Sequence, residues 1–283
     1  MMQVTKVHGC GNDFVVIADP GGTVDVGPGL VRALCDRHRG VGGDGVIRLA
    51  PPQDEGSDVF MDYRNADGGV AEMCGNGVRC VATYMLNRGL LEGDVVRVGS
   101  RAGTRRVVVT ARDERGRVVE TRVDMGAPVA TGTVTVRVPT PDGHDVTVVR
   151  TTSLSMGNPH AVIEVDDVDK APVADWGPRI ERDPAFEHGT NVEFITVPAT
   201  DVVRGRIWER GVGETLASGT GASAMAVAAH LLGRAGRQVR VEVPGGVLHT
   251  EWTVDGTLFI RGPAVEVFDA DLDAAWLRAV DHG

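Results

Sequence analysis

The stretch CGNGVRCVATYMLNRG, residues 74–89, has a counterpart in the second half of the chain in SGTGASAMAVAAHLLGRAG, residues 218–236. Both begin with a G-x-G turn, continue in an apolar run that contains small residues, and end in an Arg-Gly or Arg-Ala-Gly turn. Self-similarity at a fixed spacing is typical of a duplicated structural unit. We therefore predict two similar halves, each with a helix that starts at its G-x-G turn.

Matches outside these two stretches extend the repeat. Asn12 precedes the first stretch by nearly the same interval as Asn158 precedes the second. The interval from Asn12 to Gly45 also equals the interval from Asn158 to Asn191. Matches in the same order and spacing favour gene duplication over chance, although Asn and Gly are common in all loops. A strand with a polar end precedes each G-x-G turn, and these ends carry Asn65 in one half and Glu209 and Arg210 in the other.

Most of the chain consists of short Val- and Ile-rich alternating runs bounded by Gly, Pro and Asp, a pattern that predicts antiparallel strands. The clearest runs are residues 4–7, 14–18, 95–98, 105–110, 118–123, 134–138 and 146–149. Helical patterns are fewer, at about 29–39, 78–88, 222–236 and 272–280. The predicted fold class is α+β, with two pseudo-symmetric domains of mostly antiparallel sheet, each wrapped around a central helix. The second half is complete without the C-terminal segment, so we predict a first domain of residues 1–118 plus 267–283 and a second of 119–266.

Composition limits the possible partners. The chain has 283 residues, is 42% hydrophobic and carries a formal net charge of -10, with no basic stripe for a nucleic acid. No run approaches the roughly 20 apolar residues that span a bilayer, and the N-terminus lacks the layout of a secretory signal, so we expect a cytoplasmic protein. The four cysteines have no CxxC spacing and are expected to be reduced. A homodimer is a possible assembly, because sheets have exposed edges.

The G-x-G turns predict anion binding. First-turn amides of a helix have no intrahelical partner, and the helix dipole places partial positive charge there. A cysteine at the head of such a turn, as at Cys74, has its thiolate favoured by the same field. The alternative is an ordinary small buried residue, which most intracellular cysteines are. If the two helix ends face a common cleft, a substrate carbon can lose a proton to one side and regain it from the other, as a cofactor-independent racemase requires.

The motifs HGCGNDFVVI, RNADG, MCGNGVRC, SMGNPH, NVEF, WERGVGET and GTGA resemble, in order and spacing over nearly the whole chain, those of the diaminopimelate epimerase family. The resemblance implies Cys74 as one catalytic acid/base group and places Ser218 at the second catalytic position. It also implies substrate-binding side chains, and backbone amides that hold the reacting carboxylate. The side chains are those of Asn12, Asn65, Asn158, Asn191, Glu209 and Arg210, and the amides those of Gly75, Asn76, Gly219 and Thr220. The implied substrate is an amino acid, with L,L-diaminopimelate converted to meso-diaminopimelate.

Ser218 departs from the family, which has a cysteine there. An aliphatic hydroxyl ionises much more like water than like a thiol, whose pKa is about 8.5, so the helix end cannot make Ser218 a base. Three interpretations remain open: an epimerase impaired by replacement of the cysteine; a natural one-base relative that acts as a dehydratase, isomerase or racemase on another amino acid; and a non-enzymatic amino-acid-binding protein. No cofactor is implied, no residues have convincing metal-ligand spacing, and His160 is expected to satisfy a backbone carbonyl.

Overall fold

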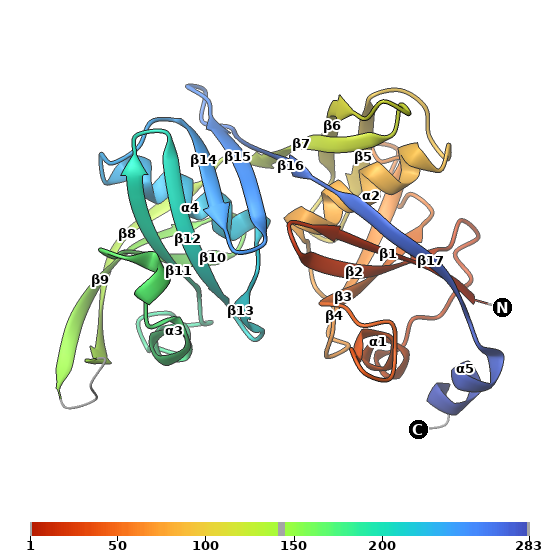
Figure 1. Ribbon diagram of the computed structural model, residues 1–283, viewed down its shortest axis with the longest axis horizontal. Helices are drawn as coiled ribbons and strands as arrows, with labels where there is room; N and C mark the ends of the chain where they lie inside the picture. The colour runs from red at the N-terminus through yellow and green to blue at the C-terminus, as the bar shows by residue number, and fades with distance from the viewer. Residues whose placement is uncertain (1, 141–144, 282–283) are drawn as a thin grey trace. The chain divides into compact units, whose positions relative to one another are not determined.

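A computed structural model describes residues 2–140 and 145–281. The chain forms two compact units, Met1–Val123 with Arg261–Gly283 (unit 1) and Asp124–Ile260 (unit 2). The chain leaves unit 1 within strand β7 (Val118–Gly126) and returns to it within strand β16 (Leu258–Pro263). Unit 1 is therefore built from both ends of the chain, and Figure 1 shows its red N-terminal and blue C-terminal strands side by side.

Unit 1 is one mixed sheet in which the strands follow the order β17-β1-β2-β3-β4-β5-β6-β7. The pairs β2–β3 and β4–β5 are parallel, and the other pairs are antiparallel. Its elements besides β7 are β1 (Met2–Gly9), β2 (Asn12–Ala18), α1 (Pro28–Cys35), β3 (Gly45–Ala50), β4 (Val59–Asn65), α2 (Gly75–Asn87), β5 (Val95–Gly99), β6 (Arg105–Arg112), β17 (Val265–Leu272) and α5 (Ala274–Asp281).

Unit 2 repeats this pattern in the order β8-β9-β10-β11-β12-β14-β15, with β10–β11 and β12–β14 as its parallel pairs. The short β13 pairs with β12. Its elements besides β16 are β8 (Val129–Pro139), β9 (Val146–Ser155), β10 (Pro159–Glu164), the 3-10 helix η1 (Val168–Lys170), α3 (Val173–Glu181), β11 (Asn191–Ala199), β12 (Val202–Glu209), β13 (Gly213–Thr215), α4 (Gly219–Leu231), β14 (Gln238–Val243) and β15 (Gly246–Trp252).

The strand register is the same in both units. In the parallel pair β2–β3 Phe14 lies opposite Gly45, and in β10–β11 His160 lies opposite Asn191. A parallel pair needs a crossover connection, and both crossovers here carry a helix, α1 or α3, that packs on the sheet. The order β17-β1-β2-β3-β4-β5-β6 in unit 1 thus matches the order β8-β9-β10-β11-β12-β14-β15 in unit 2, with the parallel pairs at the same places. This match confirms the predicted fold class, including the internal repeat.

Each sheet curls around one helix, which Figure 1 shows for α2 and α4. Nearly all of α4 from Gly219 to Ala229 is buried. Most of these residues are Gly, Ala or Val, which are small enough for strands to pack against the helix on every side. α2 is buried from Gly75 to Tyr84 and exposes only its last turn. α4 ends at Leu231, earlier than predicted, because Gly233 takes a left-handed φ of 71° there.

Helix α3 was not predicted from the sequence. It contains Pro178 inside its nine residues, and Pro172 at its N-cap makes no side-chain cap. Its apolar residues Val173 and Ile180 nevertheless pack with Phe194 of β11 in a buried cluster. Tertiary packing therefore outweighs weak local propensity in this segment.

Candidate active site

Each unit carries one group of candidate residues, here called a half-site, at the N-terminus of its central helix. Half-site 1, in unit 1, consists of Asn12, Asp44, Cys74, Asn76 and Arg79. Half-site 2, in unit 2, consists of Asn158, His160, Glu193, Ser218 and Thr220.

Cys74 and Ser218 cap the two central helices in the same way. Cys74 has φ −138° and ψ 116°, and its Sγ accepts a hydrogen bond from the N–H of Gly77 at 3.4 Å. Ser218 has φ −136° and ψ 131°, and its Oγ accepts from the N–H of Gly221 at 3.2 Å. A side chain held at an N-cap lies in the positive field of the first-turn amides. That field favours a thiolate at residue 74 and leaves a neutral hydroxyl at residue 218.

In half-site 1, Asn12 connects the thiol to its surroundings. Asn12 begins β2 directly after a tight turn in which Cys10 has the left-handed φ of 53° and Gly11 a φ of 78°. Its Oδ1 accepts from Asn76 Nδ2 at 3.0 Å and from Cys74 Sγ at 3.8 Å. Its Nδ2 donates to Asp44 Oδ2 at 2.7 Å. The two-residue hairpin turn therefore decides where this amide lies relative to the thiol.

Ion pairs behind Asn12 hold Asp44 in place. Arg37 donates to Asp44 Oδ1 at 2.9 Å and to both carboxylate oxygens of Asp13, and Lys6 also pairs with Asp13. Burial opposes ionisation of Asp13, but hydrogen bonds from Arg37 and Lys6 outweigh it and hold the pKa of this carboxyl well below its usual range. Burial raises the pKa of Asp44, and the nearby Asp13 charge adds to that increase.

The guanidinium of Arg79 lies at the other end of half-site 1. Its Nη2 donates to Asn76 Oδ1 at 2.8 Å, and both side chains are fully buried. Nε and Nη1 of Arg79 have no hydrogen-bond partner among the residues that the structure describes. Burial lowers the pKa of Arg79, whereas the thiols of Cys10, Cys80 and Cys74 act to raise it.

In half-site 2, a polar chain leads from the serine into the core. Ser218 Oγ lies 3.4 Å from Thr220 Oγ1, which accepts a long hydrogen bond of 3.4 Å from Asn158 Nδ2. Asn158 Oδ1 lies 3.0 Å from His160 Nε2, and His160 Nδ1 lies 2.6 Å from Glu193 Oε1. His160 and Glu193 are fully buried, and burial raises the pKa of Glu193 against the effect of His160. The expectation that His160 satisfies a backbone carbonyl is wrong, because both of its ring nitrogens contact side chains.

The structure brings Asn191 and Arg210 together in unit 2. Asn191 Oδ1 accepts from the backbone N–H of Arg210 at 3.0 Å, and its Nδ2 donates to the carbonyl of Pro159 at 2.9 Å. The Arg210 guanidinium donates to the carbonyl of His188 at 2.9 Å. Glu209 Oε1 accepts from Thr215 Oγ1 at 2.6 Å. The predicted residues thus stand at the ends of β10, β11 and β12.

Asn65 stands at the end of β4 in unit 1, opposite Gly45 of β3. A Cβ at Gly45 would lie 2.5 Å from the Arg64 carbonyl oxygen and 2.5 Å from Cε2 of Tyr63. The Tyr63 ring is itself packed edge-on against Phe14, with ring centroids 5.7 Å apart. Position 45 is therefore restricted to glycine by Tyr63.

Sequence reasoning missed Arg79 and Glu193 as parts of the half-sites. In each case the sequence nearby contains an indication, namely a charged residue inside an apolar run. Arg79 lies in the apolar run of helix α2, and Glu193 lies in the strand Asn191–Ala199. A charged residue is almost never fully buried unless it is paired, so its occurrence in an apolar run indicates a role beyond packing. Which partners it meets depends on the tertiary fold.

Within residues 2–140 and 145–281, no group of three or more His, Cys, Asp or Glu side chains could hold a metal ion. In the same ranges, no helix has the length and apolar character needed to cross a bilayer.

A family model described as diaminopimelate epimerase matches residues 4–131 and 152–267. A diaminopimelate epimerase from Pelotomaculum thermopropionicum is 43% identical over 281 residues, which cover 95% of this chain and 98% of that protein. One from Moorella thermoacetica is 44% identical over 285 residues, covering 95% of this chain and 99% of that protein. Among solved structures, a probable proline racemase from Agrobacterium radiobacter with bound carbonate has the same fold, with a TM-score of 0.73, 20% identity and coverage of 97% and 93% of the two chains.

Proposed function

This chain belongs to the diaminopimelate epimerase family, and from that premise we propose that it interconverts L,L- and meso-diaminopimelate without a cofactor. The single observation that carries the proposal is the family match, which extends over nearly the whole chain at 43% and 44% identity to two of the relatives. The reaction supplies meso-diaminopimelate, a precursor of lysine and peptidoglycan.

Cys74 is the base in this proposal. Its thiolate removes the α-proton of the amino acid and becomes a thiol, while charge builds up on the substrate carboxylate. First-turn amides stabilise that charge because they are already oriented toward it, which is the largest single contribution in many enzymes. The amides are those of Gly75 and Asn76 in one half-site and of Gly219 and Thr220 in the other. The hydrogen bond from Cys74 Sγ to Asn12 Oδ1 supports the position of this group, because it places the thiol beside a side chain of the substrate-binding set.

The remaining predicted residues bind the rest of the substrate. Glu209 and Arg210 bind the distal amino-acid end, which carries one ammonium and one carboxylate and therefore needs one partner of each charge. The bond from the Arg210 N–H to Asn191 supports this grouping, because it ties two of the residues together. Asn65 and Asn158, together with Asn12 and Asn191, are the amide side chains that bind the substrate in this proposal.

Ser218 limits the reaction. Donating its proton to the carbanion leaves an alkoxide. The pKa of a hydroxyl lies about 7 units above that of a thiol, which makes this step about 10 kcal/mol harder. By microscopic reversibility both directions of the epimerisation share this barrier. The thiol of Cys74 can still return its proton to the face from which it came. The expected behaviour is therefore exchange of an α-proton with retention of configuration, and slow inversion.

The test uses L,L- and meso-diaminopimelate in deuterated water, with α-proton exchange followed by NMR and configuration by chiral chromatography. The protein as given is expected to incorporate deuterium, with retention, into the one stereoisomer whose α-proton faces Cys74, and to invert either stereoisomer slowly. Ser218→Cys is expected to exchange and invert both rapidly. Cys74→Ala and the double variant Cys74→Ala/Ser218→Cys are the controls, and neither should invert the substrate. Absence of any exchange by Ser218→Cys would contradict the proposal.

A one-base reaction on another amino acid is the second candidate, and the hydroxyl at residue 218 is the observation that favours it. In such a reaction Cys74 removes the α-proton, and the reaction then completes as an elimination or an isomerisation without a second base. Turnover of a different amino acid by the protein as given, combined with no gain of inversion in Ser218→Cys, would select this candidate. Binding without exchange in both proteins would leave an amino-acid-binding protein.

A further inference from the structure

We propose that Arg79 is a positioning residue that sets the reactivity of Cys74, orienting the amides beside the thiol and supplying the positive charge that its thiolate needs. The proposal rests on the proposed function only in taking Cys74 as the base. Its physical basis lies in half-site 1 itself.

The hydrogen-bond chain in half-site 1 has only one possible direction. Arg79 can only donate, so the Asn76 atom 2.8 Å from its Nη2 is the amide oxygen. Asp44 as a carboxylate can only accept, so the Asn12 atom 2.7 Å from it is the amide nitrogen. The two amides then meet through Asn76 Nδ2 and Asn12 Oδ1 at 3.0 Å. A cation at one end and an anion at the other therefore fix an amide oxygen beside the thiol. This oxygen accepts from the S–H of Cys74 and orients it, but offers no hydrogen bond to the thiolate, whose charge must be stabilised by other groups.

Arg79 is an unusual residue to find in this core. Its side chain is fully buried, it makes no ion pair within residues 2–140 and 145–281, and two of its three nitrogens have no hydrogen-bond partner there. Burying a charge without a counter-ion costs free energy, and one hydrogen bond to Asn76 offsets only part of that cost. Stability alone therefore does not account for an arginine at this position.

A thiolate is the anion that the Arg79 charge can stabilise. The thiols of Cys10, Cys80 and Cys74 all act on its charge. Burial raises the pKa of Cys80 to about 12, against the lowering effect of Arg79, and burial likewise raises the pKa of Cys10. Cys74 is only partly buried and caps the helix, so its thiolate also has the first-turn amides. Of the three thiols, Cys74 is the one whose ionisation the surroundings support.

Other charges near this thiol are compensated. Asp44 reaches it only through Asn12 and is paired with Arg37. Glu72, two residues before Cys74, is exposed to solvent, where its charge is screened. The guanidinium of Arg79, which is buried and has no counter-ion in half-site 1, therefore acts on Cys74 through the protein interior, where solvent does not screen its charge.

The test measures alkylation of Cys74 by iodoacetamide as a function of pH, without substrate, with the modified residue identified by mass spectrometry. R79M removes the positive charge and keeps a side chain of similar length, whereas R79K keeps the charge. R112M is the control, because Arg112 is a partly exposed residue paired with Asp94 on the surface. We expect R79M to alkylate about tenfold more slowly at pH 7 and to need a higher pH for half-maximal rate, which corresponds to about one pKa unit. R79K should restore most of the rate, and R112M should match the parent protein.

Thermal unfolding of the same variants decides between tuning and a purely structural role. R79M is expected to stay folded and to melt near the temperature of the parent protein, because the desolvation cost that it removes offsets the hydrogen bond to Asn76 that it loses. An unfolded R79M, or a folded R79M with the parent's alkylation profile, would overturn the proposal. Alkylation needs no substrate, so it tests Arg79 independently of the enzymatic reaction. If alkylation depends on Arg79 as expected but the protein exchanges no α-proton of diaminopimelate, the role of Arg79 stands and the proposed function is contradicted.

Discussion

At the scale of single residues, the two half-sites differ most in the atom that heads each central helix. Cys74 presents sulfur and Ser218 presents oxygen in nearly the same backbone conformation and with the same hydrogen bond from the third residue of the helix. Their surroundings differ in charge as well. A buried guanidinium lies in half-site 1, and a buried imidazole and carboxyl pair lies in half-site 2. The repeat has kept the geometry while the chemistry has diverged.

Cys74→Ser provides a direct comparison of the two atoms in one position. The serine hydroxyl can keep the cap to Gly77 but cannot act as a base near neutral pH. We expect α-proton exchange to fall about 10²–10⁴-fold, the usual contribution of acid–base catalysis, while thermal stability changes little. Deuterium exchange and a melting curve on the same preparation check both parts, and exchange at the parent rate would remove Cys74 from the mechanism.

The ion pairs of Asp13 predict a pH dependence of stability. The folded-state pKa of Asp13 is lowered, so its contribution is fully present above the unfolded value of about 3.9. It begins to decrease below that pH and is lost completely only as the pH falls through the lower folded-state pKa. Asp13→Asn should cost about 1.5–3 kcal/mol at pH 7, the usual value for a hydrogen bond to a charged group, and should lose less stability on acidification. Urea unfolding of both proteins at pH 7 and pH 3 measures this, and parallel losses would contradict it.

At the scale of elements, the helices with a clear apolar pattern and a G-x-G start were predictable, and α3 was not. The pattern of α2 and α4 is local, since capping and small side chains lie within the segment itself. Helix α3 depends on Phe194 and other residues far along the chain, which cover its apolar side. Secondary structure that is stabilised by tertiary contacts has no sufficient signal in its own residues.

The start of β3 offers a test of close packing within an element. Gly45→Ala places a methyl group 2.5 Å from Tyr63 and the Arg64 carbonyl, and Phe14 prevents the tyrosine ring from moving. We expect a loss of about 1–3 kcal/mol, the usual cost of overpacking. Gly29→Ala in α1 is the matched control, because its Cβ meets no atom within 4 Å and alanine favours the helix by about 0.5–1 kcal/mol. Equal melting temperatures for the two variants would refute this account.

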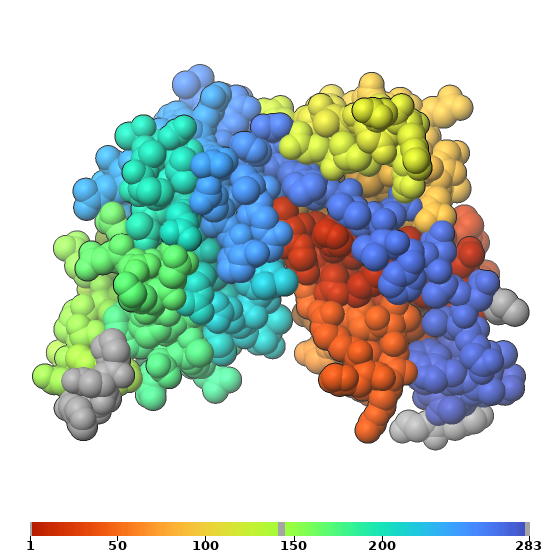
Figure 2. All heavy atoms as spheres, in the orientation of Figure 1, coloured from red at the N-terminus to blue at the C-terminus, as the bar shows by residue number. Residues whose placement is uncertain are grey.

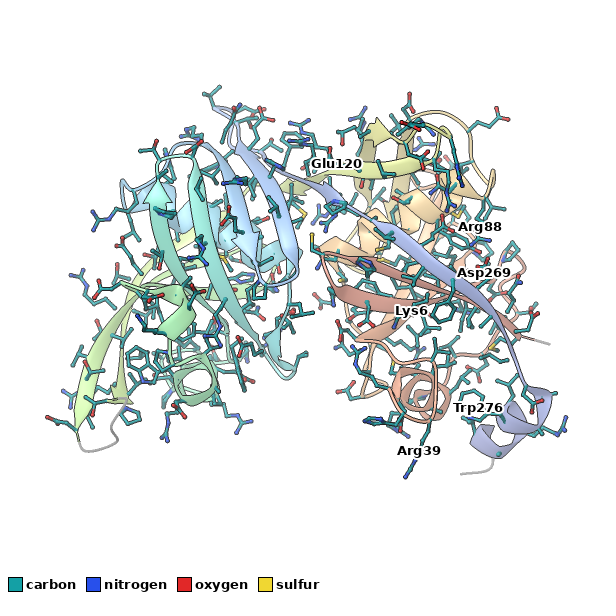
Figure 3. The ribbon with its side chains drawn as sticks, viewed as in Figure 1. Lys6, Arg39, Arg88, Glu120, Asp269 and Trp276 are labelled. Atoms are coloured by element: carbon teal, nitrogen blue, oxygen red, sulfur yellow. The ribbon has the colours of Figure 1, made fainter. Side chains whose placement is uncertain are left out.

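At the scale of the whole molecule, unit 1 depends on the last residues of the chain. Strand β17 pairs with β1 along nearly its whole length, and α5 contributes Trp276 to the cluster around α1. Arg88, just after α2, donates to both carboxylate oxygens of Asp269 on β17, and Figure 3 shows the two side chains near each other. In Figure 2 the blue C-terminal segment lies directly against the red N-terminal segment of unit 1.

Trp276→Ala is therefore expected to destabilise unit 1 selectively. The side chain is only partly buried, so we expect about 2 kcal/mol, less than for a fully buried tryptophan. Hydrogen exchange should increase in β1 and α1 and remain unchanged in β10 and β11 of unit 2. Val254→Ala is the control, since Val254 is 95% exposed. Increased exchange throughout both units would show that they unfold together and would contradict the selective effect.

The sequence by itself determined the repeat, the α+β fold class and the family, because these depend on spacing and local pattern. It also determined the chemical mismatch between Cys74 and Ser218, which follows from residue type alone. Only the tertiary structure decided that Arg79 is buried beside the thiols and that His160 meets Glu193. Those contacts join residues on different elements, and burial changes the energy of a charge by an amount that no local pattern records.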